Sequence, residues 1–214
     1  MTETQTAPEA EGEGLNWLEM IAALLLGVAG ILTAYAAYNG ALAGGDALKG
    51  YTQSSRTNSD ANGYYNDYAS IYNGDQALFT QYQLLVEAGN QDTADVLKDN
   101  LFRPELAAAT DAWLEIPEGE GPLTPLDTDA YTVEQLDTAD ALAAQAQIEF
   151  EEAALIDDQG DNFDLASVYL AVALFFAGIA TLFKVRNIQI AMLVFAILMV
   201  GPGLWFIAKG KGWS

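Results

Sequence analysis

The chain has 214 residues, 51% of them hydrophobic, and it carries 30 acidic against 8 basic side chains, for a formal net charge of −22. This charge argues against a nucleic-acid partner, because nucleic acids are bound through Lys and Arg that neutralise phosphates. The chain has no Cys and no His, which removes disulfides, the usual ligands of zinc and haem, and His-dependent triads. We therefore predict no cofactor, no metal site and no catalytic residue.

Three uncharged apolar stretches predict three transmembrane helices, since about 20 apolar residues in a helix cross the hydrocarbon core of a bilayer. The predicted segments are an acidic disordered tail at 1–14, a first transmembrane helix at 15–45, an acidic helical domain at 46–164, a second transmembrane helix at 165–183, a short basic turn at 184–187, a third transmembrane helix at 188–208 and a C-terminal tail at 209–214. The lipid bilayer is thus the first predicted partner.

The excess of acid is confined almost entirely to the first 19 residues and to the domain at 46–164. It has three interpretations. It hydrates an exposed surface, it reflects adaptation to high salt in a halophilic organism, or it collects cations. The first two are favoured over the third.

The side of the membrane that holds the acidic domain is argued from basic residues near the spans, which concentrate on the cytoplasmic side. The turn at 184–187 carries Lys184 and Arg186 with no acid beside them. The domain and the C-terminal tail share the opposite side, which holds Lys49, Arg56, Lys209 and Lys211. The raw count favours a cytoplasmic domain, whereas the concentration of charge in the short turn favours an extracytoplasmic one. We expect the extracytoplasmic arrangement.

The acidic domain is predicted to be helical. A long helix is expected over Asp46–Gly89, and a second helical stretch over Gln91–Glu115. Pro104 starts a new turn within that stretch, because proline does not fit in a helix interior but is well suited to its first turn. A proline-rich loop follows at 116–130, and a third helix is expected to begin near Thr132.

Two of these helices carry heptad-like apolar faces. The first face is rich in Tyr and is interrupted by Asp75; it consists of Ala61, Tyr65, Tyr68, Tyr72, Phe79, Tyr82 and Val86. The other is rich in Ala and consists of Leu136, Ala139, Ala143, Ala146, Phe150 and Ala153. Large against small residues predicts an antiparallel, coiled-coil-like helical hairpin. Tyr65, Tyr68 and Tyr72 either fill its core, which we favour, or form a platform for a ligand or sugar.

Two acidic patterns have features of a cation site. Asn58–Gly63 resembles the opening of a calcium loop, but Asn58 and Ala69 stand where that loop needs Asp and Glu, and a helix is favoured. A cluster of four acids lies beside the second span: Asp157, Asp158, Asp161 and Asp164. A solvated junction at the membrane surface is the favoured interpretation of this cluster.

Several short stretches resemble a family of uncharacterised prokaryotic membrane proteins with the same three-span layout. They are Ala34-Tyr35-Ala36-Ala37-Tyr38, Leu101-Phe102-Arg103-Pro104-Glu105 with Ala112-Trp113, Gly121-Pro122-Leu123-Thr124-Pro125, and Leu174-Phe175-Phe176-Ala177-Gly178-Ile179. The resemblance covers most of the chain and implies three spans with an inserted helical domain. Members often have a more basic turn between the last two spans, which implies that this domain lies outside the cytoplasm. The resemblance implies no activity.

One of these stretches supplies the candidate interaction or structural residues, which are Phe102, Arg103, Pro104, Glu105 and Trp113. Arg103 is one of only four basic residues in the domain, and we expect it to pair with a nearby acid. The alternative to an interaction role is structural, with an internal ion pair and a buried indole.

These observations favour a non-enzymatic accessory or scaffold protein of the plasma membrane, acting through a protein partner or as a homo-oligomer. A small transporter or channel subunit is one alternative, motivated by a kink expected at Gly201-Pro202-Gly203 and by an acidic vestibule. An extracytoplasmic ligand sensor that uses the tyrosine-rich face is the other.

Overall fold

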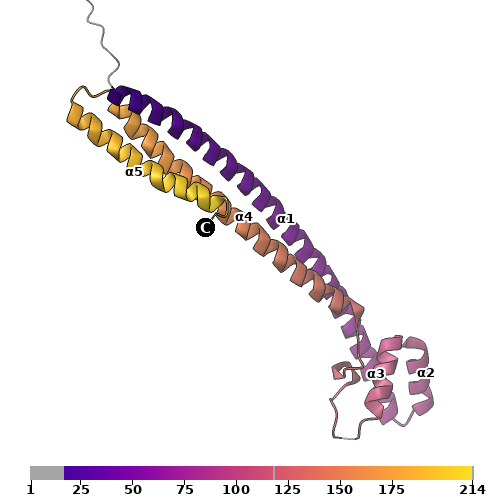
Figure 1. Cartoon of the computed structure of the whole chain (residues 1–214). Helices are drawn as coiled ribbons and strands as arrows, with labels where there is room; N and C mark the ends of the chain where they lie inside the picture. The colour runs from indigo at the N-terminus through magenta and orange to yellow at the C-terminus, as the bar shows by residue number, and fades with distance from the viewer. Residues whose placement is uncertain (1–16, 118, 214) are drawn as a thin grey trace, which may run out of the picture. The chain divides into compact units, whose positions relative to one another are not determined.

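The computed structural model describes residues 17–117 and 119–213, so the predicted tail at 1–14 lies outside the described residues. Within these residues the chain is helical and contains no strand (Figure 1). The helices are α1 (Trp17–Glu87), α2 (Gln91–Leu101), α3 (Pro104–Leu114), the short 3-10 helix η1 (Pro125–Asp127), α4 (Glu134–Ala180) and α5 (Arg186–Gly210). The all-α prediction is confirmed.

Three of these helices, α1, α4 and α5, contain stretches long and apolar enough to cross a membrane. This agrees with the three predicted spans and with a membrane protein. The connection between α4 and α5 occupies residues 181–185. It therefore begins three residues earlier than the turn predicted at 184–187. The amides of Thr181 and Leu182 bond to the carbonyls of Gly178 and Ile179, and this tighter pattern ends α4 at Ala180.

The chain forms two compact units, the first of which comprises the described residues up to Gly50 together with 152–213. Parts of α1 and α4 and all of α5 pack together there through alanines that are at most 1% exposed. These are Ala22, Ala29, Ala36, Ala47, Ala153, Ala166, Ala173, Ala177, Ala180 and Ala196. Large apolar side chains such as Leu24, Ile31 and Phe175 point outward, being 61–72% exposed. Small residues inside let helices approach closely, and large apolar residues outside suit a lipid environment.

Gly50 and Gly203 each lie in close contact with a residue of α4 in this unit. A side-chain carbon added at Gly50 would lie 2.7 Å from Cβ of Ala153, and one added at Gly203 would lie 2.7 Å from Cγ of Leu170. Gly203 follows Pro202 within α5, which continues as one helix through the proline. The predicted Gly-Pro-Gly feature therefore takes part in packing against α4.

A glycine pair in α1 tests this packing. Gly50→Ala is expected to lower the unfolding free energy by about 1–3 kcal/mol, because the added methyl collides with Ala153. Gly45→Ala is the matched control, since nothing lies within 4 Å of a carbon added there, and it is expected to stabilise the helix by about 0.5–1 kcal/mol. Thermal unfolding of the full chain in detergent measures both variants. Equal melting temperatures for the two would contradict the close contact.

Lys211, the residue that follows α5, holds the C-terminal end of that helix. Nζ of Lys211 lies 5.5 Å from the ring centroid of Tyr35 and 5.9 Å from that of Phe163. The same nitrogen donates a 3.5 Å hydrogen bond to Oδ1 of Asn39. Cation–π attraction therefore ties the end of α5 to both α1 and α4.

The second unit comprises Tyr51–Glu151. Within it α1 and α4 exchange hydrogen bonds between positions far apart in sequence. The hydroxyl of Ser54 donates to the Ala146 carbonyl at 2.7 Å, and that of Thr57 donates to the Glu149 carboxylate at 2.8 Å. Ser54 and Thr57 are each 7% exposed, so these buried hydroxyls have partners, as buried polar groups require.

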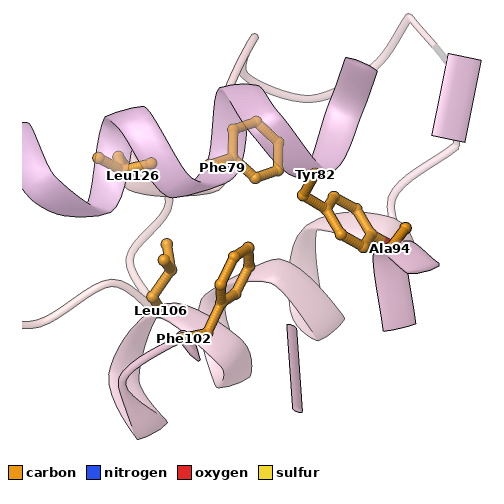
Figure 2. Close-up of a cluster of buried hydrophobic side chains, with 6 residues drawn as sticks. All are labelled: Phe79, Tyr82, Ala94, Phe102, Leu106 and Leu126. Atoms are coloured by element: carbon orange, nitrogen blue, oxygen red, sulfur yellow. The ribbon is translucent and has the colours of Figure 1, made fainter. Parts of the chain in front are cut away.

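The same unit contains an apolar core to which four helical segments contribute (Figure 2). Phe79 and Tyr82 of α1 face Ala94 of α2, Phe102 after it, and Leu106 of α3. Leu126 of η1 completes the cluster. Because α2 and α3 are only 11 residues each, burial in this shared core rather than helix propensity stabilises them.

The predicted heptad faces are partly buried as expected. Ala61, Phe79 and Tyr82 are at most 5% exposed on α1, and Ala139 and Ala146 are at most 4% exposed on α4. Two members depart from the pattern: Val86 is 38% and Phe150 is 49% exposed. Val86 lies in the last turn of α1, and Phe150 packs its ring at 5.2 Å against Tyr51 near the surface.

Candidate functional site

The stretch Phe102–Glu105 lies at the junction between α2 and α3. Arg103 is extended there, with φ −65° and ψ 154°, because the residue before a proline avoids the helical region. Pro104 is the first residue of α3, where its missing N–H costs no helical hydrogen bond. The predicted restart of the helix at Pro104 is confirmed.

Arg103 forms a multidentate ion pair with Asp75 of α1. Its Nη2 lies 2.7 Å from Oδ2 of Asp75, and its Nε lies 3.1 and 3.2 Å from the two carboxylate oxygens. Nη1 also donates to Glu105 at 3.0 Å. The Asp75 side chain is 4% exposed and that of Arg103 is 32% exposed. The hydrogen bond with Asp75 raises the pKa of Arg103, so the guanidinium stays charged.

Tyr131, in the segment between η1 and α4, completes this network. Its hydroxyl donates a 2.8 Å hydrogen bond to Oδ2 of Asp75. Burial, and then the hydrogen bond to Asp75, raises the pKa of Tyr131 well above its usual value. We call Asp75, Arg103, Glu105 and Tyr131 the Arg103 network. It joins α1, the start of α3 and the segment before α4, and it leaves the buried carboxylate fully partnered.

A Tyr131→Phe variant tests the proton on this phenol. The folded chain retains it at pH values where the unfolded chain, with a pKa near 10, has lost it. The resulting stability is complete below about pH 10 and is lost as the pH rises further. We expect the unfolding free energy of the wild-type chain to fall more steeply above pH 10 than that of Tyr131→Phe. At neutral pH the variant is expected to be about 1 kcal/mol less stable than the wild type, because it lacks the hydrogen bond to Asp75. Urea titrations across the pH range measure both, and parallel profiles would contradict the assignment.

The two aromatic candidates of this stretch belong to the apolar core. The Phe102 ring lies edge-on to Tyr82 with centroids 5.8 Å apart. The Trp113 ring lies edge-on to Phe79 at 5.5 Å, and its Nε1 donates a 2.8 Å hydrogen bond to the Pro122 carbonyl. That bond ties α3 to the proline-rich loop. The structure thus gives both residues internal contacts, with Phe102 buried and the Trp113 indole half-buried.

The three candidate tyrosines also contact neighbours within the unit. The hydroxyl of Tyr65 donates to Oδ1 of Asp140 at 2.5 Å, and this hydrogen bond raises the pKa of Tyr65. The rings of Tyr68 and Tyr72 lie 5.9 Å apart, and Tyr72 lies edge-on to Tyr131 at 6.2 Å. These contacts extend from the Arg103 network along α1, where all three tyrosines are half-buried and Tyr72 packs against the apolar core.

Sequence reasoning missed two members of the Arg103 network, Asp75 and Tyr131. A signal for Asp75 was present, since it interrupts the apolar face of α1 with a charge, and in the structure it is 3% exposed. A lone acid at a buried position requires a cationic partner. Tyr131 follows a proline-rich loop without periodicity, and no pattern marks it.

The two acidic patterns with features of a cation site, at residues 58–63 and 157–164, lie in continuous helix. Residues 58–63 belong to α1 and 157–164 to α4, and a calcium loop needs a sharp turn that a helix does not supply. In the parts of the chain that the structure describes, no three acidic side chains converge in a way that could hold a metal ion.

A hollow of about 350 Å³ lies beside the Trp113 indole. Its walls come from the end of α3 and the loop that follows: Trp113, Leu114, Ile116, Pro117, Gly119, Gly121 and Pro122. This volume falls at the lower end of the range for small-molecule sites. The hollow and the Arg103 network thus both lie beside predicted candidate residues. Comparison of the chain with protein-family models, with curated proteins and with solved structures finds no match.

Proposed function

We propose that the chain is a non-enzymatic accessory or scaffold protein of the plasma membrane. In this proposal residues 46–164 form a helical-hairpin, coiled-coil-like domain inserted between the first two spans. That domain lies outside the cytoplasm and binds a partner protein or a second copy of the chain. Hydrogen bonds between α1 and α4, such as those of Ser54 with Ala146 and Tyr65 with Asp140, support the hairpin.

The observation that carries the proposal is a set of exposed large apolar side chains around the core of the second unit. Each is more than half exposed, from 53% to 89%, although an apolar core is available nearby. They are Leu84, Val96, Leu101, Leu114 and Leu123. They come from α1, α2, α3 and the following loop, the same elements that enclose the core. Removing such side chains from water stabilises a complex by about 25 cal/mol per Å² of apolar area.

The Arg103 network then has a supporting role. Arg103, Asp75 and Tyr131 contact one another within the unit. They hold α1, α3 and the segment before α4 in a fixed arrangement, and this presents the exposed leucines and Val96 on rigid elements. Preorganised surfaces bind more tightly because less freedom is lost on association.

Affinity purification from native membranes in mild detergent, with mass spectrometry and crosslinking, tests the proposal. We expect a stoichiometric partner protein or a dimer of this chain. A Val96→Ser/Leu101→Ser variant should lose this association, because both side chains belong to the exposed apolar set. Ile148→Ser is the control, since Ile148 is 52% exposed on α4 but lies outside that set. A monomer with no partner and no crosslinks would refute the proposal.

Cysteine labelling tests the extracytoplasmic location. The chain has no native cysteine, so only an introduced cysteine reacts. Asp99 and Asn187 are exposed on α2 and α5, and each is replaced by Cys in a separate variant. A membrane-impermeant maleimide should label Asp99→Cys in intact cells and Asn187→Cys only after lysis. The concentrated charge of Lys184 and Arg186 supports this expectation. The opposite labelling pattern would assign the domain to the cytoplasm.

Ligand sensing is a second candidate function, and the hollow beside Trp113 is the observation that favours it. Trp113 is the only tryptophan between residues 51 and 151, so its fluorescence reports on that hollow once Trp17, Trp205 and Trp213 are replaced by Phe. A small molecule that binds there is expected to shift the Trp113 emission and to raise the melting temperature. If a ligand changes neither signal, it does not occupy the hollow.

A further inference from the structure

An apolar groove of about 180 Å³ lies between the first turns of α1 and the first half of α5. Trp17, Leu18 and Ile21 line it from α1, and Ile190, Val194 and Ile197 line it from α5. All of these residues belong to the first compact unit. The groove lies beside a buried cluster that includes Leu18, Ala22, Ala180 and Leu193, so it is a surface feature over packed side chains. Its lining is entirely apolar.

Positive charge lies at one end of this groove. Arg186 is the first residue of α5, and Ile190, Val194 and Ile197 follow it at helical spacings of four, eight and eleven. Residues at such spacings share one face of a helix, so Arg186 stands at the mouth of the groove. Lys184 precedes it in the connection to α4. Both side chains are exposed.

Neither of these cations has an acidic partner in the structure. Over residues 17–117 and 119–213 no ion pair involves Lys184 or Arg186. The nearest acid in sequence on α1 is Glu19. At about 100° per residue it lies some 200° around the helix from both Trp17 and Ile21, and so it faces away from the groove.

We propose that the first compact unit binds one molecule of an anionic glycerophospholipid at the groove. An acyl chain lies in the groove, and the phosphate contacts Arg186 and Lys184. The Trp17 side chain, 52% exposed at the same end, suits the headgroup level, where indoles collect. Cationic residues between helix ends attract anionic headgroups, and among the described residues no acid forms an ion pair with these two.

The size of the groove favours an acyl chain over a helix from another protein. Its volume of about 180 Å³ is smaller than the 300–1,000 Å³ typical of sites that enclose a whole small molecule. It therefore accommodates part of a thin chain, whereas a helix about 10 Å wide does not enter it. A phosphate group at the mouth gives the two cations a partner that residues 17–117 and 119–213 do not supply. The site is independent of the proposed interaction role, because no residue of it lies between 51 and 151.

Native mass spectrometry of the full chain in mild detergent tests the site. The probes are phosphatidylglycerol and phosphatidylcholine with identical acyl chains. We expect one phosphatidylglycerol per chain, retained about tenfold more strongly than phosphatidylcholine. Lys184→Gln/Arg186→Gln should abolish that preference, and Val194→Trp, which fills the groove, should remove retention of both lipids. Lys49→Gln/Lys209→Gln removes the same charge elsewhere and should change nothing.

Four results would overturn the proposal. They are equal retention of the two lipids by the wild-type chain, unchanged preference in Lys184→Gln/Arg186→Gln, full competition by soluble glycerol phosphate, and displacement of lipid by a second copy of the chain. Soluble glycerol phosphate has the headgroup chemistry without the acyl chain, so it separates a free-phosphate site from a lipid site. Loss of a protein partner in the Val96→Ser/Leu101→Ser variant would leave lipid retention intact, which keeps the two proposals distinguishable.

Discussion

Replacing Arg103 with Met is expected to lower the unfolding free energy of the second unit by about 3–5 kcal/mol. The change leaves the Asp75 carboxylate, 4% exposed, inside the unit without its cation and with only the Tyr131 hydroxyl as a close partner. Met keeps the length and apolar stem of the side chain, so the measured loss reports the missing guanidinium. Urea unfolding followed by Trp113 fluorescence, in a chain whose other three tryptophans are replaced by Phe, measures it, because Trp113 packs on the adjoining core.

Removing both charges is the decisive control for this prediction. Asp75→Leu/Arg103→Met leaves no buried charge unpartnered, and we expect it to recover more than half of the loss seen in Arg103→Met. Glu105→Gln is the mild comparison, since the Glu105 side chain is 44% exposed and exposed ion pairs contribute about 0–1 kcal/mol. A double variant as unstable as the sum of its single changes would show that the pair is not coupled.

Replacing Phe79 with Ala is expected to cost about 3–5 kcal/mol, the range for an aromatic side chain removed from a core. Phe79 is 2% exposed, and its ring contacts both Tyr82 and Trp113. The cavity opens where α1, α2 and α3 meet, so we expect the contacts of Trp113 to loosen and its emission to shift to longer wavelength. Urea unfolding and the emission spectrum of the folded variant are the measurements.

The matched control for Phe79→Ala lies five residues away on the same helix. Leu84 is 61% exposed, and Leu84→Ala is expected to change stability by less than about 0.5 kcal/mol. The same residue belongs to the apolar set proposed to bind a partner, so Leu84→Ala should weaken association while it preserves folding. If Phe79→Ala were no more destabilising than Leu84→Ala, the core assignment would be wrong.

Much of the helical architecture was predictable because it depends on local signals. Uncharged runs about 20 residues long marked the three membrane segments. Pro104 marked the break between α2 and α3, which the structure has at 102–103. The 4-3 spacing along α1 identified Phe79 and Tyr82 as inward-facing, and both are buried. Each of these inferences needed information from only one continuous stretch of the chain.

The Arg103 network was only half predictable because its partners are distant in sequence. Arg103 was expected to pair with a nearby acid, and Glu105 is such an acid, but the multidentate partner is Asp75, 28 residues earlier. A choice among the many acids of the chain needs the fold of the α2–α3 segment back onto α1. Tyr131 reaches Asp75 from 56 residues away and from a loop whose path no periodicity describes. Charge attraction has no sequence period, whereas burial on a helix does.

Heptad spacing also overstated burial near the ends of the predicted faces. Phe150 occupies the same register as Ala146 and Ala153, yet it is 49% exposed while those two are at most 4% exposed. The close approach of α1 at Gly50 and Ser54 admits only small side chains from α4. The larger ring is turned outward against Tyr51 instead. Spacing predicts which face is inward, and the space between helices decides which side chains fit there.

The shared carboxylate of the Arg103 network has a consequence for how sequences of this kind diverge. Asp75 is bonded to Arg103 and to Tyr131, so the first substitution at any of the three positions meets a buried group left without its partner. An apolar residue at position 75 becomes acceptable only after position 103 has lost its charge, and the reverse order is equally obstructed. Divergence should therefore proceed by paired replacement, and homologous chains should carry the aspartate and arginine together or an apolar pair in their place.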